Sequence, residues 1–302
     1  EDPYYFIWYI TGFKPAKHHQ IWLARMFHPD KKRVNIVAPR ESAKSTVSVY
    51  ALAWLMAKYP LLTFGIVAVS STVAKDRLSM LRQLFGDNSR FKNVFPWIHI
   101  DLHRPDTQDE FTLYSDYNGM PYNIWKTSIT TNRSELVKKP SIFASGNGGK
   151  GIIGRRGSGV LLMDDMVDDS FLSDDLQTKM MKYISSVLEP CVTELGRIWN
   201  IGTRWMVNDI YERLMGNPAW TTIMIPGIIE DDNGNKFSYW PEYWPLAKLD
   251  DKRIAMDDDL LFRIMYLCDP TAITAALFAP DTLLRDIPDY HPAFVDVYVI
   301  MD

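Results

Sequence analysis

The stretch that decides the fold is VNIVAPRESAKSTVSVYALAWL, residues 34–55. Its apolar start, Val34–Ala38, predicts a β-strand, and Lys44–Lys58 has the pattern of an amphipathic helix. A strand, a turn and a helix that opens with Lys44-Ser45-Thr46 is the layout of a phosphate-binding loop (P-loop). In such a loop backbone N–H groups surround the β-phosphate, the lysine bridges the β- and γ-phosphates, and the hydroxyl coordinates Mg²⁺.

The loop departs from the usual P-loop at three positions. Ala38 and Ala43 stand where glycines are usual, and the turn contains a carboxylate, Glu41. Alanine is small, and only a backbone with positive φ strictly demands glycine. The helix N-terminus adds a field that favours anions. We therefore predict an ATP site with Mg²⁺, formed by Pro39, Arg40, Glu41, Ser42, Ala43, Lys44, Ser45 and Thr46.

The composition is that of a soluble globular protein of 302 residues, with 47% hydrophobic and 23% charged residues. No apolar run is long enough to span a membrane, so no membrane partner is expected. Two cysteines, Cys191 and Cys268, are too few for a disulfide framework and favour a reducing compartment. The net charge of −4 argues weakly against a generally basic nucleic-acid binder, although local clusters such as Lys31-Lys32-Arg33 leave DNA contact open.

Short β-rich runs alternate with helical patterns along the chain, which is typical of a mainly parallel sheet flanked by helices. Further predicted strands are Phe64–Ser70, Ser141–Ser145, Val160–Met163, Arg197–Gly202 and Thr221–Pro226, and further helices are Thr72–Phe85, Leu172–Leu188 and Asp209–Met215. From about Asp231 a segment rich in Trp and Pro is followed by an amphipathic helix, which predicts a small subdomain.

The strand Val160–Met163 runs directly into two carboxylates, Asp164 and Asp165. Ligands of open α/β sheets gather at the carboxyl ends of the strands. We expect Asp164 to share Mg²⁺ with Ser45 and Asp165 to polarise the attacking water, while Asp168 and Asp169 cap the following turn. The predicted fold is therefore α/β, a P-loop NTPase of the ASCE (RecA-like) type with a small linker subdomain.

Two arginines, Arg155 and Arg156, follow a glycine-rich segment just before the acidic strand. Paired arginines suit phosphate or developing transition-state charge, so they are assigned a catalytic role beside Lys44 and Asp165. One of them is a candidate arginine finger for a neighbouring subunit's nucleotide. Contact with DNA phosphate, or no ligand at all, remains open.

Two further segments carry weaker signals. Gly202, Thr203 and Arg204 follow an apolar strand and are predicted to sense the γ-phosphate and couple hydrolysis to movement. Upstream of the loop, Gln20 and Trp22 are placed to read or stack on adenine, although a surface helix with one buried Trp explains the pattern equally well.

The ordered set of motifs resembles the ATPase half of the large terminase subunit of tailed bacteriophages, over nearly the whole chain. The matching segments are HHQIWL, APRESAKST, AVSSTVAKDRLSML, SIFASGNGGKGIIGRRGSGVLLMDD, IGTRWMVNDIYERL and IPGIIEDDNGNKFSYWPEYW…FRIMYLCDP. Family members commonly have Pro-Arg-Gly where this chain has Pro39-Arg40-Glu41, and often Asp-Glu in place of Asp164-Asp165. Glu41 in place of glycine changes the geometry expected for the loop. Asp165 in place of glutamate gives the catalytic acid a shorter side chain.

The resemblance implies a motor that uses ATP and Mg²⁺ to move double-stranded DNA into a procapsid in the cytoplasm of the infected bacterium. It also implies a small terminase subunit, a capsid portal and a homo-oligomeric ring as partners. The domains expected are an ATPase domain at 1–230, a linker subdomain at 231–292 and the start of an RNase H-like nuclease at 293–302. Asp302 would be a metal ligand of that nuclease, and we expect a fragment of a longer protein without nuclease activity.

Two other functions remain open from the sequence. A catalytically degenerate P-loop domain that serves for docking is favoured by Glu41, because a carboxylate near phosphates repels them unless it points to solvent or pairs with Arg40. A helicase-type ATPase ranks lower, since no Gln-x-x-Gly-Arg-x-x-Arg element follows Gly202.

Overall fold

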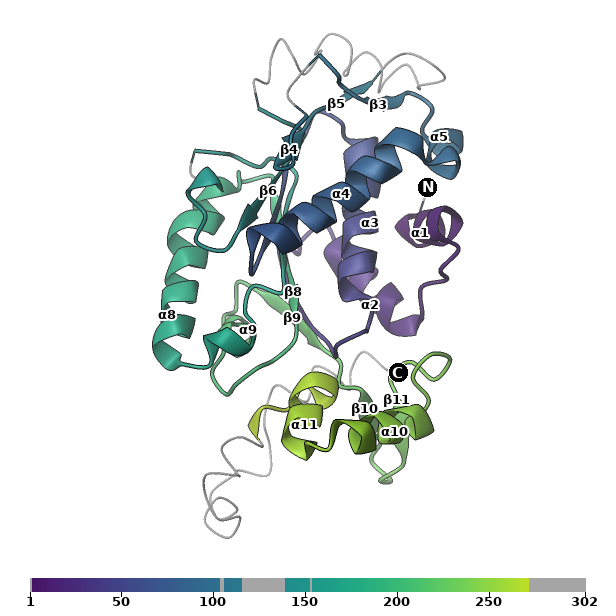
Figure 1. The fold of residues 1–302 in the computed structure, drawn as a ribbon, viewed down its shortest axis with the longest axis vertical. Coiled ribbons are helices and arrows are strands. Elements are labelled where there is room, and N and C mark those ends of the chain that lie inside the picture. The colour runs from purple at the N-terminus through teal and green to yellow at the C-terminus, as the bar shows by residue number, and fades with distance from the viewer. Residues whose placement is uncertain (1, 104–105, 116–138, 153, 272–302) are drawn as a thin grey trace. The chain divides into compact units, whose positions relative to one another are not determined.

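The computed structural model of the chain describes residues 2–103, 106–115, 139–152 and 154–271. Its main element is a mostly parallel sheet of seven strands in the order β4-β6-β2-β7-β8-β1-β9, flanked by helices (Figure 1). The strands of this sheet are β1 Arg33–Val37, β2 Phe64–Ala68, β4 Glu110–Phe111, β6 Ile142–Gly146, β7 Val160–Asp164, β8 Arg197–Gly202 and β9 Thr221–Met224. The predicted α/β fold is confirmed.

The chain forms two compact units. The first comprises Glu1–Pro15, Ser45–Met166 and Lys182–Asn200, and the second comprises Ala16–Lys44, Val167–Met181 and Ile201–Asp302. The domain boundaries expected from the sequence stay a prediction, and the segment 293–302 with Asp302 lies outside the described residues.

In the first unit β2 lies between β6 and β7 and is parallel to both, while β4 is antiparallel to β6. All five residues of β2 and of β7 are buried, as expected for strands covered on both faces. Helix α4 packs on β2 and β6. The remaining elements of this unit are α1 Pro3–Thr11, α3 Lys44–Lys58, α4 Ser71–Asp87, α5 Ser89–Val94, the antiparallel strands β3 Ile98–Ile100 and β5 Leu113–Ser115, and short helical turns at Lys150–Ile152, Ile184–Leu188 and Glu189–Cys191.

In the second unit β1 and β9 are parallel neighbours, with Val34 opposite Thr221 and Val37 opposite Met224. Helices α2 and α9 pack on this pair. The Trp/Pro-rich segment forms an antiparallel hairpin followed by two helices rather than the single helix predicted. The remaining elements are α2 Lys17–Met26, the turn Asp169–Phe171, α8 Asp174–Tyr183, α9 Ile210–Met215, the hairpin strands β10 Ile228–Glu230 and β11 Lys236–Ser238, α10 Leu246–Met256 and α11 Asp259–Leu267.

Local signals explain where several helices begin and end. The Asp2 carboxylate caps α1 by accepting the Tyr4 N–H, and Ser70 caps α4 by accepting the Val73 N–H. Helix α1 ends at Gly12, which has a φ of 74°. The six strands predicted from the sequence are confirmed; Arg197–Gly202 has the predicted bounds, and the ends of the other five differ by at most two residues. Helix α3 has the predicted bounds.

Candidate active site

The turn between β1 and α3 takes a conformation that glycine would adopt without strain. Glu41 and Ala43 have φ values of 60° and 59°, in the left-handed region. This region costs a residue with a Cβ about 1–2 kcal/mol. The loop is therefore strained at these two residues, and other contacts have to hold it.

Backbone carbonyls and one histidine supply those contacts within the second unit. The Ala38 N–H donates to the Gly202 carbonyl at 3.0 Å, and the Arg40 N–H donates to the Met265 carbonyl at 2.9 Å. His19 accepts the Ala16 N–H at Nδ1, so its Nε2 carries the proton and donates to the Ser42 carbonyl at 2.8 Å. The turn is fixed at its first, third and fifth residues.

Lys44, the first residue of α3 and part of the second unit, has a buried ammonium. Its Nζ donates to Thr203 Oγ1 at 2.9 Å and lies 3.5 Å from the Pro39 carbonyl. Thr203 in turn donates to the Ala38 carbonyl at 3.1 Å. The structure thus joins Lys44 to a residue of the predicted coupling turn.

The first unit joins the loop hydroxyl to the acidic strand. Ser45 Oγ donates to Asp164 Oδ1 at 2.7 Å, and the Asp164 side chain is fully buried. A hydroxyl and a carboxylate oxygen are the hard ligands that Mg²⁺ takes from protein, with phosphates and water completing its shell. The pair therefore fits the predicted Mg²⁺ site. Among the described residues no cluster of three or more His, Cys, Asp or Glu forms a metal site.

Asp164 has a second partner that the sequence analysis missed. Arg77 of α4 donates from Nε to Asp164 Oδ2 at 2.6 Å, and its side chain is 26% exposed. A guanidinium compensates the carboxylate, which would otherwise be a costly buried charge. The available signal was topological: α4 begins just after β2, so its first turns start at the carboxyl edge of the sheet, beside the end of β7.

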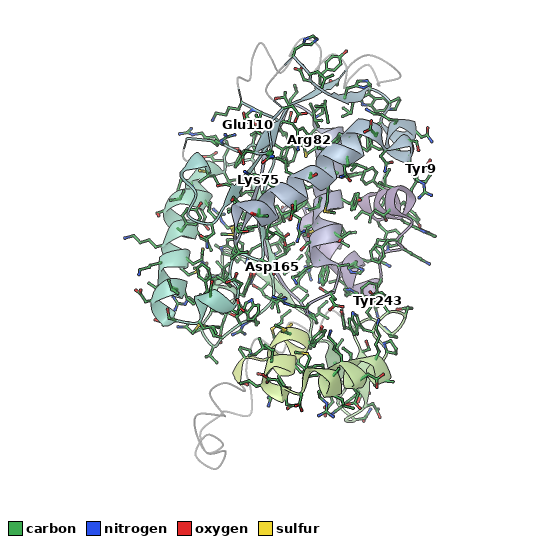
Figure 2. The ribbon with its side chains drawn as sticks, in the orientation of Figure 1. Tyr9, Lys75, Arg82, Glu110, Asp165 and Tyr243 are labelled. Atoms are coloured by element: carbon green, nitrogen blue, oxygen red, sulfur yellow. The ribbon has the colours of Figure 1, made fainter. Side chains whose placement is uncertain are left out.

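Asp165 begins the turn after β7 with a φ of 46° (Figure 2). Its carbonyl accepts the Val69 N–H at 3.2 Å, which ties the turn to the end of β2. Asp168 caps the next helical turn by accepting the Ser170 N–H at 3.0 Å, so its predicted capping role is confirmed. The catalytic role of Asp165 stays a prediction.

The two arginines differ in their surroundings. Arg155 forms an ion pair with Glu110 of β4, donates from Nε to the Gly151 carbonyl at 2.8 Å, and lies over the Phe143 ring. Arg156 is exposed. An arginine that acts on another molecule must be able to reach away from its own unit, which favours Arg156 over Arg155 for the finger role.

The turn after β8 is held by charged side chains, of which Arg204 and Asp209 are buried. Arg204 donates from Nε to Asp209 Oδ2 at 3.0 Å and from a terminal nitrogen to Glu212 at 2.5 Å, and it is 6% exposed. These contacts commit the guanidinium to the turn itself. A Cβ at Gly202 would lie 1.9 Å from the Tyr211 hydroxyl, so only glycine fits there. Of the three predicted coupling residues, Thr203 is the one whose side chain contacts the phosphate loop.

The other residues predicted to contact the nucleotide take no part in the hydrogen bonds of Lys44 and Ser45 described above. Gln20 is on the exposed side of α2, and the Trp22 ring is completely buried, which leaves it no face for a base. The Arg40 guanidinium lies 5.1 Å from the centre of the Trp205 ring. Thr46, the third residue of α3, is half-buried.

Two adjacent histidines are buried beside the loop. Burial lowers the pKa of His18 to about 3, with the neighbouring His19 adding to the effect, and burial lowers the pKa of His19 to about 4. His18 packs against Trp22, Tyr239 and Trp240. Both rings are neutral at pH 7, and for His19 this agrees with Nδ1, which accepts the Ala16 N–H and therefore carries no proton.

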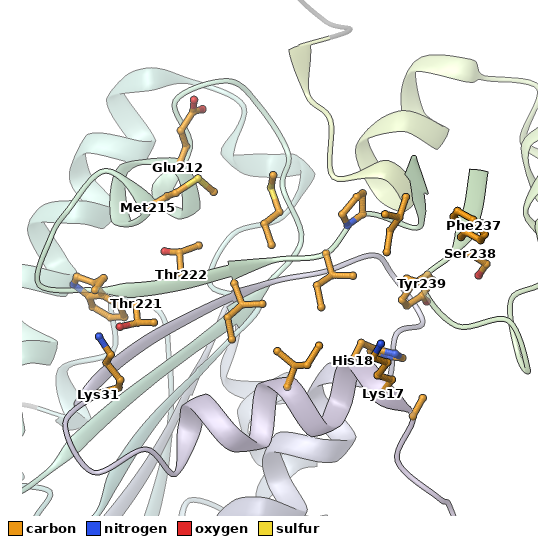
Figure 3. A pocket seen from close by; sticks show the side chains of 18 of the residues that line it. Lys17, His18, Lys31, Glu212, Met215, Thr221, Thr222, Phe237, Ser238 and Tyr239 are labelled. Carbon is orange, nitrogen blue, oxygen red and sulfur yellow. The ribbon is translucent and has the colours of Figure 1, made fainter. Parts of the chain in front are cut away.

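His18 also lines a cavity of about 1010 Å³ in the second unit, along β9 and between α2 and the β10–β11 hairpin (Figure 3). Its wall is mainly apolar, with Trp220, Ile223 and Phe237 among its residues. None of the residues predicted to bind ATP lines it. Sequence reasoning gave no sign of this cavity, because its walls come from segments that lie far apart along the chain.

The fold is that of an α/β P-loop NTPase. Among solved structures, the chain shares its fold with the ATPase domains of phage large terminases. The large terminase ATPase domain of Thermus phage P74-26 matches 87% of this chain and 96% of its own length, with a TM-score of 0.55 and 15% identity. A mutant of that domain matches 86% of this chain and 95% of its own, with a TM-score of 0.56 and 15% identity.

The large terminase of a thermophilic bacteriophage in complex with ADP is a more distant match, with a TM-score of 0.45, 11% identity and coverage of 83% of this chain and 52% of its own. No protein-family model matches the sequence, and no curated protein matches it significantly. None of the described helices is long and apolar enough to cross a membrane.

Proposed function

We propose that this chain is an ATP-hydrolysing motor domain that translocates double-stranded viral DNA into a procapsid, as the ATPase part of a large terminase. The observation that carries the proposal is the hydrogen bond from Ser45 to the buried Asp164. It pairs the loop hydroxyl with the carboxylate of the acidic strand, as a P-loop NTPase requires for Mg²⁺. The shared fold with terminase ATPase domains supports the choice of motor.

The chain's residues divide the work as follows. Backbone N–H groups of the turn before Lys44 hold the phosphates, and the Lys44 ammonium compensates their charge. Ser45 and Asp164 would hold Mg²⁺, which screens the triphosphate. Asp165 orients and deprotonates the attacking water, and Arg156 stabilises charge that develops on the transferred phosphoryl group. Thr203, bonded to Lys44, passes the change in phosphate contacts to the turn after β8.

The contact with DNA is proposed to be with backbone phosphate and independent of sequence, so affinity falls steeply with salt. The proposed partners are double-stranded DNA, a small terminase subunit, a capsid portal and further copies of the chain in a ring. The proposed setting is the cytoplasm of a phage-infected bacterium. The docking alternative loses its main support, since the Glu41 carboxylate has protein partners instead of facing phosphate unpaired.

The test is ATP hydrolysis with and without double-stranded DNA, measured for the wild type, Lys44→Ala, Asp165→Asn and Asp168→Asn. We expect turnover to require Lys44 and Asp165, ATP binding to survive in Asp165→Asn, and DNA to stimulate the wild type. Asp168→Asn is the matched control, because that carboxylate caps a turn. If Lys44→Ala hydrolysed ATP as fast as the wild type, the assignment of the phosphate loop would be wrong. If DNA did not change the turnover of the wild type, the motor function would be wrong.

A further inference from the structure

The Glu41 carboxylate points out of the phosphate loop toward α11. The Tyr266 hydroxyl donates to Glu41 Oε1 at 3.2 Å, and the Lys252 ammonium lies 3.9 Å from the same oxygen. The loop residue that departs most from the usual P-loop is therefore the residue that reaches the α10–α11 helices. Both partners belong to the second unit.

Tyr266 is a fixed anchor. Its ring is buried, stacks on Phe262 at a centroid distance of 5.3 Å and meets the edge of Trp244 at 5.6 Å. Its carbonyl accepts the Gly227 N–H at 2.8 Å, and a Cβ at Gly227 would lie 2.3 Å from that oxygen, so only glycine permits this approach. Burial, with the Glu41 charge adding to it, raises the pKa of Tyr266 to about 12, so the hydroxyl remains a donor at neutral pH.

A second contact runs parallel to the first. The Arg40 N–H donates to the Met265 carbonyl at 2.9 Å, so consecutive loop residues bind consecutive residues of α11. In a glycine-containing loop the left-handed turn needs no support. Here the turn carries strain at Glu41, and these two bonds to α11 offset it.

We propose that Glu41 and Tyr266 form a positioning pair, which holds the phosphate loop in its nucleotide-binding conformation and transmits nucleotide occupancy to α11. The inference rests on the proposed function and names the regulation of the same site. Because the pair and the parallel bond from Arg40 to Met265 join the strained turn directly to α11, a change in the loop displaces the end of α11. The chain continues from that end beyond residue 271.

The experiment combines hydrogen exchange at the amides of residues 40–44 without nucleotide and equilibrium binding of ATP. The variants are Tyr266→Phe, Glu41→Ala, their combination, and Glu41→Gln, which keeps an acceptor for the hydroxyl. Tyr243→Phe is the matched control, because it removes a hydroxyl from an exposed tyrosine of the same unit, whose ring stacks on Trp240.

Loss of one hydrogen bond to a partly exposed carboxylate predicts roughly fivefold faster loop exchange and roughly fivefold weaker ATP binding in either single variant. The double variant should be no worse than the singles, Glu41→Gln should recover most of the loss, and Tyr243→Phe should match the wild type. ATP should slow exchange at the end of α11 in the wild type and not in Tyr266→Phe.

Unchanged loop exchange in both single variants overturns the positioning pair. So does a lower melting temperature without faster loop exchange, because that pattern marks a contact that only supports the fold. If the wild type binds no ATP but its loop exchange still depends on Tyr266, the proposed function and the transmission to α11 are wrong. The role of the positioning pair in holding the loop then remains supported.

Discussion

The ammonium of Lys44 lies 2.9 Å from Oγ1 of Thr203, so the residue that opens α3 and the residue that follows β8 share a hydrogen bond. Thr203 also donates a hydrogen bond to the Ala38 carbonyl, at the start of the loop. The contact is buried, and both ends of the phosphate loop therefore depend on one hydroxyl. A phosphate that draws Lys44 toward it has to loosen this contact.

Thr203→Val removes the hydroxyl and keeps the shape of the side chain. We expect ATP binding to change little, because Lys44 keeps its charge, and stimulation of hydrolysis by DNA to fall about tenfold, because the link to the turn after β8 is lost. Turnover assays with and without DNA measure the ratio. Thr203→Ser, which retains the donor and acceptor, is the control, and equal stimulation in both variants would remove Thr203 from the coupling path.

Arg77 and Asp164 form a pair in which one charge is fully buried, so the pair predicts a specific pattern of stability. Arg77→Met leaves the Asp164 carboxylate with the Ser45 hydroxyl alone and should cost about 3 kcal/mol. Combining it with Asp164→Asn removes the uncompensated charge, so the double variant should lose less than the sum of the singles. Urea unfolding of the four proteins measures this, and strict additivity would mean that the two groups do not interact in solution.

Substitution should show that Arg155 and Arg156 have different roles, one in stability and the other in turnover. Arg155→Ala breaks the ion pair with Glu110 and the contact with Phe143, and it should lower the free energy of unfolding by about 1 kcal/mol. Arg156→Ala should leave the stability unchanged and reduce turnover at least tenfold under conditions where the chains assemble. Thermal unfolding and ATPase assays distinguish the two, and the opposite assignment would follow from the reverse pattern.

The sequence predicts the strands of this fold well because their signal is local. Val160–Asp164 is buried along its whole length, and the change from its apolar run to its carboxylates marks where it ends. The short strands β3 and β5 were missed, since three residues carry too little periodicity to be recognised. Helices α10 and α11 were predicted as one helix, because Asp257 and Asp258, where the first ends and the second begins, are also common on the exposed face of a helix.

The candidate site was predictable where the chemistry is continuous along the chain, as in Lys44 and Ser45. Partners that meet only through the fold were not. Arg77 precedes Asp164 by 87 positions, and Tyr266 follows Glu41 by 225. Charge alone suggested a partner for Glu41 among its neighbours, namely Arg40, whereas the fold supplies Tyr266 and Lys252 and leaves Arg40 beside Trp205.

The buried pair His18 and His19 makes stability depend on pH. Both pKa values are lower in the folded protein, at about 3 and about 4, than the value of 6.5 for an unperturbed histidine. Between these pKa values and pH 6.5, the two histidines are protonated in the unfolded chain but neutral in the folded protein. The stabilising effect of the neutral rings is therefore complete above pH 6.5 and is lost as the pH falls. At pH 5 the loss is about 2 kcal/mol for each ring.

We expect the melting temperature to fall between pH 7 and pH 5, and the fall to be roughly halved in His18→Gln, which cannot titrate. His28→Gln is the matched control, because that histidine is only half-buried and lies outside the buried pair. Circular dichroism melts of the three proteins at several pH values measure the slope. If the slope in His18→Gln equalled that of the wild type, the His18 ring would have to be protonated or exposed in solution, and its packing against Trp22 and Tyr239 would be wrong.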